Sequence, residues 1–480
     1  MKGRPAPGSI LELTAEAMAL DGDAVARAGT YVLLVPGAIP GERIEVEVVS
    51  AGRKSGKAAL RRVLAPSPHR VAPFCRHFGP CGGCAWQHIA YEEQLRLKRD
   101  MLASTLARAL GSEVKVLPTV GLPSGDIPSP AGPRGYRHKA HFTFGSGPGG
   151  RGLIMGHYRR GSRDLLPVEE CPVHAPAGNR IAFAARDLLR RKGVPGADED
   201  TLEGLARHIV VRTSAATGVT QAVIVAVRED PRLRGAAEEL GALEDAPRGI
   251  HLEIHDRPGP FIRGSRTAKL AGEDRLIEEV AGARFSLSER SFFQTSVRSA
   301  ERLAAAVLGR VPEGPGRVLD LYAGAGLFSI PLALRGARVL AVEENPSAVA
   351  DGRASLDLNP GIRGECRFER RRVEDFLRDH DPGPEPAGTV ILDPPREGCP
   401  PGVLEALASL GAARAIYVSC NPRALARDIA VLAKRGCAVI EVEPVDMFPH
   451  TAHIEAVALV SMPERRPPSA RRRAAKRRRR

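Results

Sequence analysis

The sequence lacks long apolar runs. No segment reaches eighteen consecutive apolar residues, so no membrane span is expected. The first residues, MKGRPAPGSILEL, contain no apolar core of the kind that signal peptides carry, which favours a cytoplasmic, reducing location. Because disulfides are rare in such a compartment, the eight cysteines are expected to be metal ligands, nucleophiles or buried thiols.

A glycine-rich segment at 318–333, VLDLYAGAGLFSIPLA, lacks the features of two common nucleotide sites. No third glycine completes a dinucleotide fingerprint, and no P-loop lysine follows the turn. The segment still predicts a strand, a tight turn that includes Gly324, and a helix, which together form the cofactor cradle of a doubly wound α/β fold. The next expected strand ends in Glu343, whose carboxylate can accept hydrogen bonds from both ribose hydroxyls. The pattern favours S-adenosylmethionine as the cofactor and leaves a dinucleotide as the alternative.

Positive charge exceeds negative charge, and the formal net charge is +14. Ten of the last sixteen residues, Arg465 to Arg480, are Lys or Arg. Such a tail is either a solvated, disordered segment or an arm that gains affinity for phosphates by releasing counterions. The excess of positive charge therefore makes nucleic acid the expected partner. The length of the chain fits about three domains.

Residues 9–64 predict a small β-barrel. Short strands at 31–35, 43–50 and 58–64 are separated by turns rich in Gly and Pro. Barrels of this size often bind oligonucleotides, and basic residues crowd one end of this one. The segment LDGDAVARAGTYVLLVPGAIPGERIEVEV resembles the TRAM domain, an RNA-binding barrel, and its PGAIPGE turn carries most of the likeness.

Four cysteines form a candidate metal site. Three follow the spacing C-x5-C-x2-C in CRHFGPCGGC, and a fourth lies in VEECPVH. Four thiolates suit a [4Fe–4S] cluster or zinc, and the spacing matches neither common zinc-finger pattern, which favours the cluster. The four residues are Cys75, Cys81, Cys84 and Cys171.

Between the barrel and the glycine-rich segment, the pattern predicts a helix followed by an α+β region. Residues 92–110 have apolar residues on one helical face, at Leu95, Leu102, Leu106 and Ala109, and this helix is expected to pack on the C-terminal domain. In RGYRHKAHFTF, residues 134–144, apolar and basic residues alternate. A strand of this kind can present its basic face to RNA, or it can be an edge strand kept soluble by charge. A hairpin is expected over 206–227.

From about residue 286 onward, strands alternate with helices, which predicts a parallel sheet. Expected strands cover 318–322, 338–343, 388–393, 414–419, 437–443 and 453–460. Four motifs in this region carry the chemistry: SFFQTS with Gln294, VILDPPREG with Asp393, IYVSCNP with Cys420, and FPHTAHIEAVAL, in which His453 and Glu455 are expected to share a strand face.

A cysteine and a carboxylate in these positions suit methylation of a uracil at carbon 5. A thiolate that adds to carbon 6 makes carbon 5 nucleophilic, and a base then removes the carbon-5 proton so that the thiolate can leave. Cys420 fits the nucleophile and Glu455 the base, while Asp393 could hold the pyrimidine or orient the cofactor. Cys399 is a rival nucleophile. The target base has to leave its stack, which is easiest in single-stranded RNA.

Together these motifs resemble the RNA uracil-C5 methyltransferase family, from about residue 9 to residue 462. The resemblance implies that the cofactor contacts Gln294, Tyr322, Glu343 and Asp393, that Cys420 is the nucleophile and Glu455 the base, and that the four cysteines hold [4Fe–4S]. It also implies an RNA substrate, with ribosomal RNA favoured and the tRNA T-loop possible, and a monomer. Leu327 and Ser296 stand where such enzymes often carry Asn.

The resulting expectation is an α/β protein with three domains and a tail. An OB-like TRAM barrel would cover 1–70, and an α+β domain with the iron–sulfur cluster would cover 71–91 and 113–285. A Rossmann-like class I methyltransferase domain would cover 92–112 and 286–462, followed by a basic tail at 463–480. An RNA cytosine-C5 methyltransferase is disfavoured, because a Pro-Cys or Thr-Cys nucleophile motif is missing. A non-catalytic RNA-binding or ribosome-assembly protein is disfavoured by the intact Cys420 and Glu455.

Overall fold

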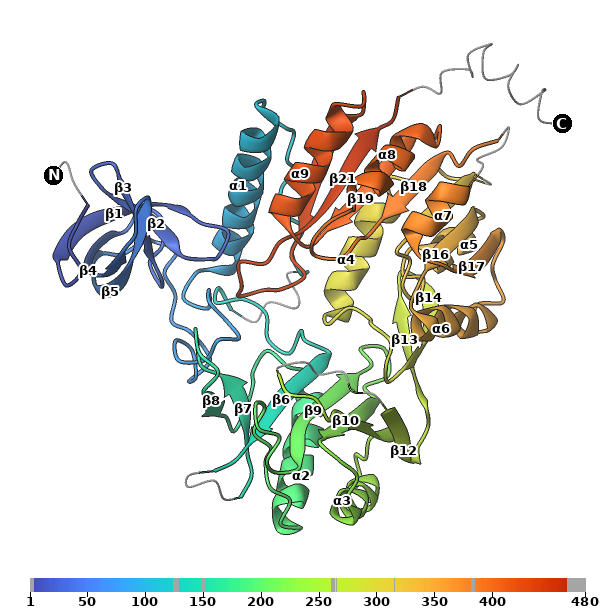
Figure 1. The fold of residues 1–480 in the computed structure, drawn as a ribbon, viewed down its shortest axis with the longest axis horizontal. Helices are drawn as coiled ribbons and strands as arrows, with labels where there is room; N and C mark the ends of the chain where they lie inside the picture. The colour runs from blue at the N-terminus through green and yellow to red at the C-terminus, as the bar shows by residue number, and fades with distance from the viewer. Residues whose placement is uncertain are drawn as a thin grey trace.

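The chain folds into a small barrel, a central seven-stranded sheet and a C-terminal seven-stranded sheet (Figure 1). The computed structural model describes residues 4–123, 129–147, 152–259, 264, 266–314, 316–380 and 385–463. The basic tail therefore lies outside the described residues, apart from Pro463. Within the described part, no helix has both the length and the apolar composition needed to cross a bilayer.

The N-terminal barrel is closed, with strand order β1-β2-β3-β5-β4. Its strands are β1 (Ile10–Met18), β2 (Ala24–Ala28), β3 (Tyr31–Val35), β4 (Arg43–Ala51) and β5 (Ser55–Ala65). The expected small barrel is thus confirmed. The PGAIPGE turn ends in the fully buried Glu42, whose carboxylate accepts hydrogen bonds from the Ile39 backbone N–H at 2.9 Å and from Arg70 Nη2 at 2.7 Å. This carboxylate ties the barrel to the segment that leads into the first cysteines.

Helix α1 (Tyr91–Leu110) packs on the C-terminal region, against α9 (Pro422–Ala433) and β20 (Ala438–Val445). Its buried face differs from the expected one, because Ala109 is exposed and Leu95 only half-buried. The buried side chains include Leu97, Met101, Leu102, Leu106 and also the charged Lys98. The apolar pattern alone missed this face because a lysine lies at its centre.

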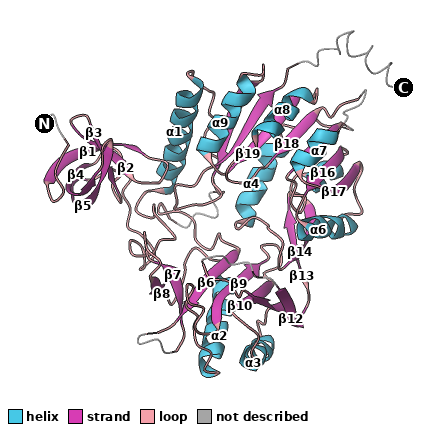
Figure 2. Ribbon diagram, in the orientation of Figure 1, coloured by secondary structure: helices cyan, strands magenta, loops and turns pink. Residues whose placement is uncertain are grey.

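The central region is a seven-stranded mixed sheet with order β12-β11-β10-β9-β6-β7-β8, covered by α2 and α3 (Figure 2). The elements are β6 (Lys139–Gly145), β7 (Ile154–Tyr158), β8 (Leu165–Pro167), α2 (Pro176–Arg191), β9 (Ala206–Thr213), β10 (Thr220–Ala226), α3 (Pro231–Gly241), β11 (Gly249–Ile254) and β12 (Arg266–Gly272). The hairpin expected over 206–227 is confirmed as β9–β10. Strand β6 lies inside the sheet between β9 and β7, so it is not an edge strand.

The C-terminal sheet has the order β17-β16-β15-β18-β19-β21-β20. Strands β15 to β19 run parallel, and β21 is antiparallel to both of its neighbours. The elements are α4 (Val297–Leu308), β15 (Arg317–Leu321), α5 (Ser329–Leu334), β16 (Arg338–Glu343), α6 (Pro346–Asp357), β17 (Glu365–Arg370), α7 (Val373–Asp379), β18 (Thr389–Leu392), α8 (Pro401–Ser409), β19 (Arg414–Ser419), α9, β20 and β21 (Glu455–Ser461). The six expected strands are all present.

Three strands in this part of the chain escaped prediction. β17 is one, and the hairpin β13 (Arg275–Val280) with β14 (Ala283–Ser288), which packs beside α4 and α6, supplies the others. β17 reads ECRFER and buries only Phe368, so it carries no apolar run. The barrel core continues into α1 and one face of the C-terminal sheet, while a second core covers the opposite face.

Candidate active site and cysteine cavity

Four predicted site residues meet at the carboxyl edge of the C-terminal sheet. Tyr322 follows β15, Glu343 ends β16, Asp393 follows β18, and Cys420 follows β19. These strands are parallel neighbours, and their register pairs Leu321 with Leu392, so Tyr322 and Asp393 lie side by side, while Cys420 lies farther along at the same edge. Ligands of open α/β sheets bind outside this edge.

The glycine turn after β15 forms the cradle that the sequence predicted. Tyr322 has a φ of 63°, Gly324 of 56° and Gly326 of 90°, so three of five residues adopt the left-handed region. A Cβ at Gly326 would lie 2.7 Å from the Phe368 ring, which excludes any side chain there. The Gly324 N–H donates to Glu343 Oε2 at 2.9 Å, so the carboxylate expected to bind ribose is fixed against the turn.

Three acidic side chains, Asp320, Glu343 and Asp393, lie near this turn and interact with one another. Asp320 is fully buried in β15 and accepts a hydrogen bond from the Ser329 hydroxyl. Burial raises its pKa to about 7, and the charges of Asp393 and Glu343 add to this rise. Burial and the charge of Glu343 likewise raise the pKa of Asp393 to about 7. A cationic ligand would relieve this repulsion, as the sulfonium and ammonium groups of S-adenosylmethionine can.

Asp320 was missed by sequence reasoning. Its signal was a carboxylate inside the apolar strand VLDLY, where a charged residue is costly unless it has a function.

Cys420 and Glu455 face each other across two antiparallel strands. The register pairs Ser419 of β19 with Ala456 of β21, so the next position brings Cys420 opposite Glu455. Burial raises the pKa of the Cys420 thiol to about 11; the charges of Glu455 and Asp393 reinforce this, and Arg396 opposes it. Burial and the neighbouring Asp393 raise the pKa of Glu455 well above its usual range. A half-buried thiol and a buried carboxylate of high proton affinity therefore lie opposite each other at this end of the sheet.

The expectation that His453 shares a strand face with Glu455 is wrong. β21 begins at Glu455, and His453 lies before it on an exposed turn, where its backbone N–H donates to the Thr451 hydroxyl. The alternation rule failed because the strand starts two residues later than the apolar pattern suggested.

The rival nucleophile Cys399 lies in the core. Its side chain is 4% exposed, its backbone N–H donates to Asp428, and burial raises its pKa to about 12. The side chain of Asn421 caps α9 and donates to the Arg396 carbonyl oxygen at 2.9 Å, which joins the SCNP and DPPREG loops. Of the two thiols, Cys420 is the one placed for chemistry at the strand ends.

Gln294 lies in a segment that packs beside the cradle. Its neighbour Phe293 is buried in the same cluster as Ala323 and Ala325, whereas Phe292 is 64% exposed. Ser296 caps α4 by accepting a hydrogen bond from the Ser299 backbone N–H. The Ser at this position, where Asn was expected from the resemblance, therefore has a structural role.

A buried network fixes the loop that leads into Glu455. His450 has a φ of 64°, and its carbonyl oxygen accepts hydrogen bonds from the backbone N–H groups of both Ala85 and Trp86, directly after Cys84. The Gln94 side-chain oxygen accepts from the His450 backbone N–H at 2.8 Å. Nearby, Lys98 donates to Asp446 at 2.5 Å, and both side chains are fully buried. The apolar pattern gave no signal for these residues.

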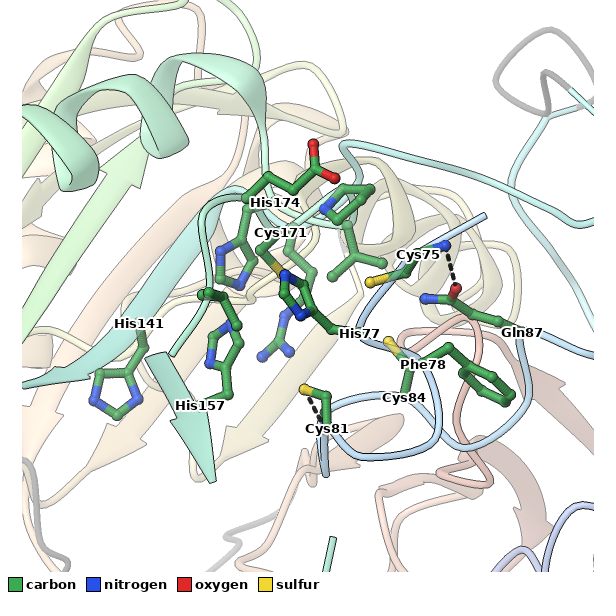
Figure 3. A pocket seen from close by; sticks show the side chains of 16 residues that line it. Cys75, His77, Phe78, Cys81, Cys84, Gln87, His141, His157, Cys171 and His174 are labelled. Carbon is green, nitrogen blue, oxygen red and sulfur yellow. Dashed lines mark hydrogen bonds between the residues drawn. The ribbon is translucent and has the colours of Figure 1, made fainter. Parts of the chain in front are cut away.

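The four predicted cysteines line one cavity of about 150 Å³ (Figure 3). Cys75, Cys81 and Cys84 come from one loop, and Cys171 faces them from the loop before α2. Burial raises the pKa of Cys84 to about 11 and that of Cys171 to about 12; charges of other thiols in the set add to both shifts. Such thiols become ligands only when a cation replaces their protons.

The basic face of the strand in RGYRHKAHFTF also reaches this cavity. Arg137 and His141 line it, and the charge of Arg137 lowers the pKa of Cys84 and of Cys171. The idea that these two side chains face RNA is therefore not supported, because both line the cysteine cavity.

Comparisons with known proteins give the chain a family. The family model described as tRNA (uracil-5-)-methyltransferase matches residues 263–462. An RNA methyltransferase of Listeria monocytogenes is 34% identical over 466 residues, 95% of this chain and 98% of that one. One of Gloeobacter violaceus is 35% identical over 470 residues, 95% of this chain and 99% of that one. The chain belongs to the RNA uracil-C5 methyltransferase family.

A solved relative shows that the likeness extends to the whole architecture of this RNA methyltransferase. The Pyrococcus abyssi tRNA (uracil-54, C5)-methyltransferase, in complex with S-adenosyl-L-homocysteine, is 26% identical with a TM-score of 0.72. The match covers 94% of this chain and 99% of that one. The expected activity class, an S-adenosylmethionine-dependent RNA methyltransferase with a C-terminal methyltransferase domain and a small N-terminal barrel, is confirmed.

Proposed function

We propose that this methyltransferase transfers a methyl group to carbon 5 of a uracil in RNA through a covalent adduct with Cys420. The observation that carries the proposal is the strand register that sets Cys420 opposite Glu455, together with the charge interaction between Cys420 and Asp393. This arrangement supplies the two groups that the reaction needs on one rigid sheet, because adjacent strands hold both.

In the proposed reaction, Cys420 first loses its thiol proton to solvent; the charge of Arg396 favours the thiolate, whereas burial and the charges of Glu455 and Asp393 oppose it. The sulfur adds to carbon 6 of the ring, and the electron pair released onto carbon 5 takes up the methyl group of the donor, which would leave as a neutral thioether. Glu455 then accepts the proton from carbon 5, and the bond between sulfur and carbon 6 breaks. The raised pKa of Glu455 supports this role, since a carboxylate of high proton affinity is a stronger base.

The methyl donor would bind at the glycine turn. Glu343, Gly324 and Tyr322 would hold its nucleoside part, Asp393 would border its sulfonium, and Gln294 would approach from the segment before α4. The acidic surroundings support a cationic cofactor. Burial and neighbouring carboxylates raise the pKa values of Asp320 and Asp393 to about 7, and a bound cation would stabilise the charged forms of both. The sulfonium supplies the transferable methyl group.

We also propose that Cys75, Cys81, Cys84 and Cys171 hold a [4Fe–4S] cluster. Around one zinc ion, thiolate sulfurs lie ~3.8 Å apart for a tetrahedral site with bonds of about 2.3 Å. Among the described residues, the group of three metal-type ligands found within 4.8 Å contains only one of these thiols. The wider thiol spacing supports a multi-iron group, each of whose irons takes one thiolate.

The cluster would act as a structural clip. The backbone N–H groups that follow Cys84 hold the loop before Glu455 through the His450 carbonyl oxygen. Protein purified without oxygen should be brown and contain about four irons per chain. A colourless, zinc-loaded protein with full methyl transfer would contradict the cluster.

The target RNA is the finer part of the proposal. The family resemblance of the whole set of motifs leads us to propose a uracil in large-subunit ribosomal RNA. The whole-length likeness to an enzyme whose name states tRNA uracil-54 favours the tRNA T-loop as the second candidate. The barrel and the exposed Phe292 beside the cofactor segment would contact the RNA in either case.

Tritium release tests both the reaction and the target. Ribosomal RNA and tRNA labelled at uracil carbon 5, from a strain without this protein, are each incubated with the enzyme and S-adenosylmethionine. Stoichiometric release from ribosomal RNA alone is expected. Release from tRNA alone would move the proposal to the T-loop, and release from neither would refute uracil-C5 methylation of these RNAs.

A further inference from the structure

One side of the cysteine cavity carries a second, tighter set of metal-type ligands. The donor atoms of His157, Cys171 and His174 all lie within 4.8 Å of one another. His157 belongs to β7, and the other two belong to the turn before α2, so the set comes from the central sheet rather than from the loop of the first three cysteines. Figure 3 shows both imidazoles beside Cys171, on the side facing away from Cys75 and Cys84.

Packing fixes this set before any ion arrives. The His174 backbone N–H donates to the Cys171 carbonyl oxygen at 3.0 Å, which closes the turn that carries both ligands. The buried Phe142 ring stacks on His157 with centroids 4.8 Å apart and meets His174 edge-on at 5.0 Å. Backbone hydrogen bonds between Arg137 and residues 173 and 175 hold the turn along the sheet. The two rings therefore have little freedom to turn away.

The imidazoles also lack partners that a structural role would give them. His157 Nε2 and His174 Nδ1 are buried atoms without a hydrogen bond. A ring nitrogen that carries no proton keeps a lone pair that can bind an ion. Buried nitrogen atoms left unpaired are costly, and a metal ion would satisfy them.

We infer that His157, Cys171 and His174 form a binding site for a single divalent ion of the zinc type when the iron–sulfur cluster is absent. Two imidazoles and one thiolate suit Zn²⁺, Fe²⁺ or Co²⁺. The site shares Cys171 with the proposed cluster, so the two groups exclude each other. The inference rests on the cavity geometry, and it shares only that cysteine with the proposed function.

Cobalt is the probe that separates the two sites, because a Co²⁺–thiolate bond absorbs light and zinc does not. Full-length protein is stripped of metal, reduced and titrated anaerobically with CoCl₂, and the absorption spectrum is recorded. One Co²⁺ per chain with a thiolate-to-metal band is expected, and Zn²⁺ should displace it.

Two kinds of variant should dissociate the sites. His157→Ala and His174→Ala should weaken Co²⁺ binding by ~100-fold or more, since even outer-shell partners contribute 10–100-fold. Both should keep the brown colour and the iron content of protein purified without oxygen. Cys75→Ser should do the opposite, keeping Co²⁺ binding while losing the iron.

His141→Ala is the matched control, because His141 lines the same cavity but lies outside the set. It should bind Co²⁺ like the unaltered protein. Each variant is compared by circular dichroism, so that loss of folding is distinguished from loss of a ligand. The inference would be overturned if Cys75→Ser lost Co²⁺ binding while both histidine variants kept it. That outcome would leave the proposed methyl transfer untouched.

Discussion

The corner that contains Cys420 and Glu455 and the cysteine cavity hold their thiols in place in different ways. Cys420 and Glu455 are positioned by the register of adjacent strands in one sheet. The four cavity cysteines lie on two loops far apart in the sequence, and backbone hydrogen bonds from Gly82 to Tyr158 and from Arg160 to Pro80 attach the first loop to the central sheet. Strand pairing fixes Cys420 and Glu455 through the backbone of one sheet, whereas the cysteine cavity depends on hydrogen bonds between separate segments.

Removal of the catalytic thiol should have the largest effect. Cys420→Ala should lower methyl transfer by at least about 10⁴-fold while RNA binding persists, since loss of a covalent nucleophile removes the main reaction route. Incorporation of labelled methyl groups into RNA measures it. Cys399→Ala is the control, and it should keep most of the activity because its thiol lies in the core. Residual turnover of Cys420→Ala near the control level would move the nucleophile elsewhere.

Removal of the base should stall the reaction after the adduct forms. Glu455→Gln should reduce turnover by about 10²–10⁴-fold and accumulate a covalent protein–RNA complex, because the carbon-5 proton has no acceptor. The complex is seen as a shifted band on a denaturing gel. Glu405→Gln, on the exposed part of α8, is the control and should give no such band. An inactive Glu455→Gln without adduct would assign Glu455 to an earlier step.

The buried ion pair between Lys98 of α1 and Asp446 should contribute to the stability of the fold. Lys98→Met leaves the Asp446 charge buried and unpaired, which should lower the free energy of unfolding by about 3–5 kcal/mol. Urea unfolding followed by the fluorescence of Trp86, the one Trp of the chain, measures this, since its ring centre lies 6.0 Å from Lys98 Nζ. The double variant Lys98→Met/Asp446→Leu should recover most of the loss, and an unchanged midpoint in Lys98→Met would show that the pair contributes little.

The smallest effect concerns pH and the cofactor. Asp320 and Asp393 have pKa values of about 7 without ligand, and a cation bound beside them should lower both. The complex then holds fewer protons than the free enzyme, so affinity for S-adenosylmethionine should rise with pH up to about 7. The slope should reach at most about tenfold per pH unit for each group, measured by calorimetry. Asp320→Asn should flatten the slope, and proton uptake on binding would contradict this account.

The sequence predicted which of these residues lie at the carboxyl edge of the C-terminal sheet, because alternating strands and helices determine which strand ends meet. Cys420 and Asp393 each follow an apolar strand, and that pattern alone puts them at one edge. Glu455 lies on the predicted strand, whereas His453 does not, because the strand begins at Glu455.

Most features that the sequence did not predict depend on contacts between segments far apart in the chain. The pairing of Lys98 with Asp446 joins residues far apart in the chain, and a lysine in a helix usually indicates an exposed face. Likewise, nothing in the spacing of His157 and His174 indicates that Phe142 holds both rings beside Cys171. β17 remained hidden because its side chains are mostly exposed.

The left-handed turn at His450 has a consequence for relatives of this enzyme. Such a backbone costs a residue with a side chain about 1–2 kcal/mol, and here the backbone N–H groups of Ala85 and Trp86 compensate for it. A homologue whose loop did not present these two donors would need other donors before β21, or a glycine where this chain has His450.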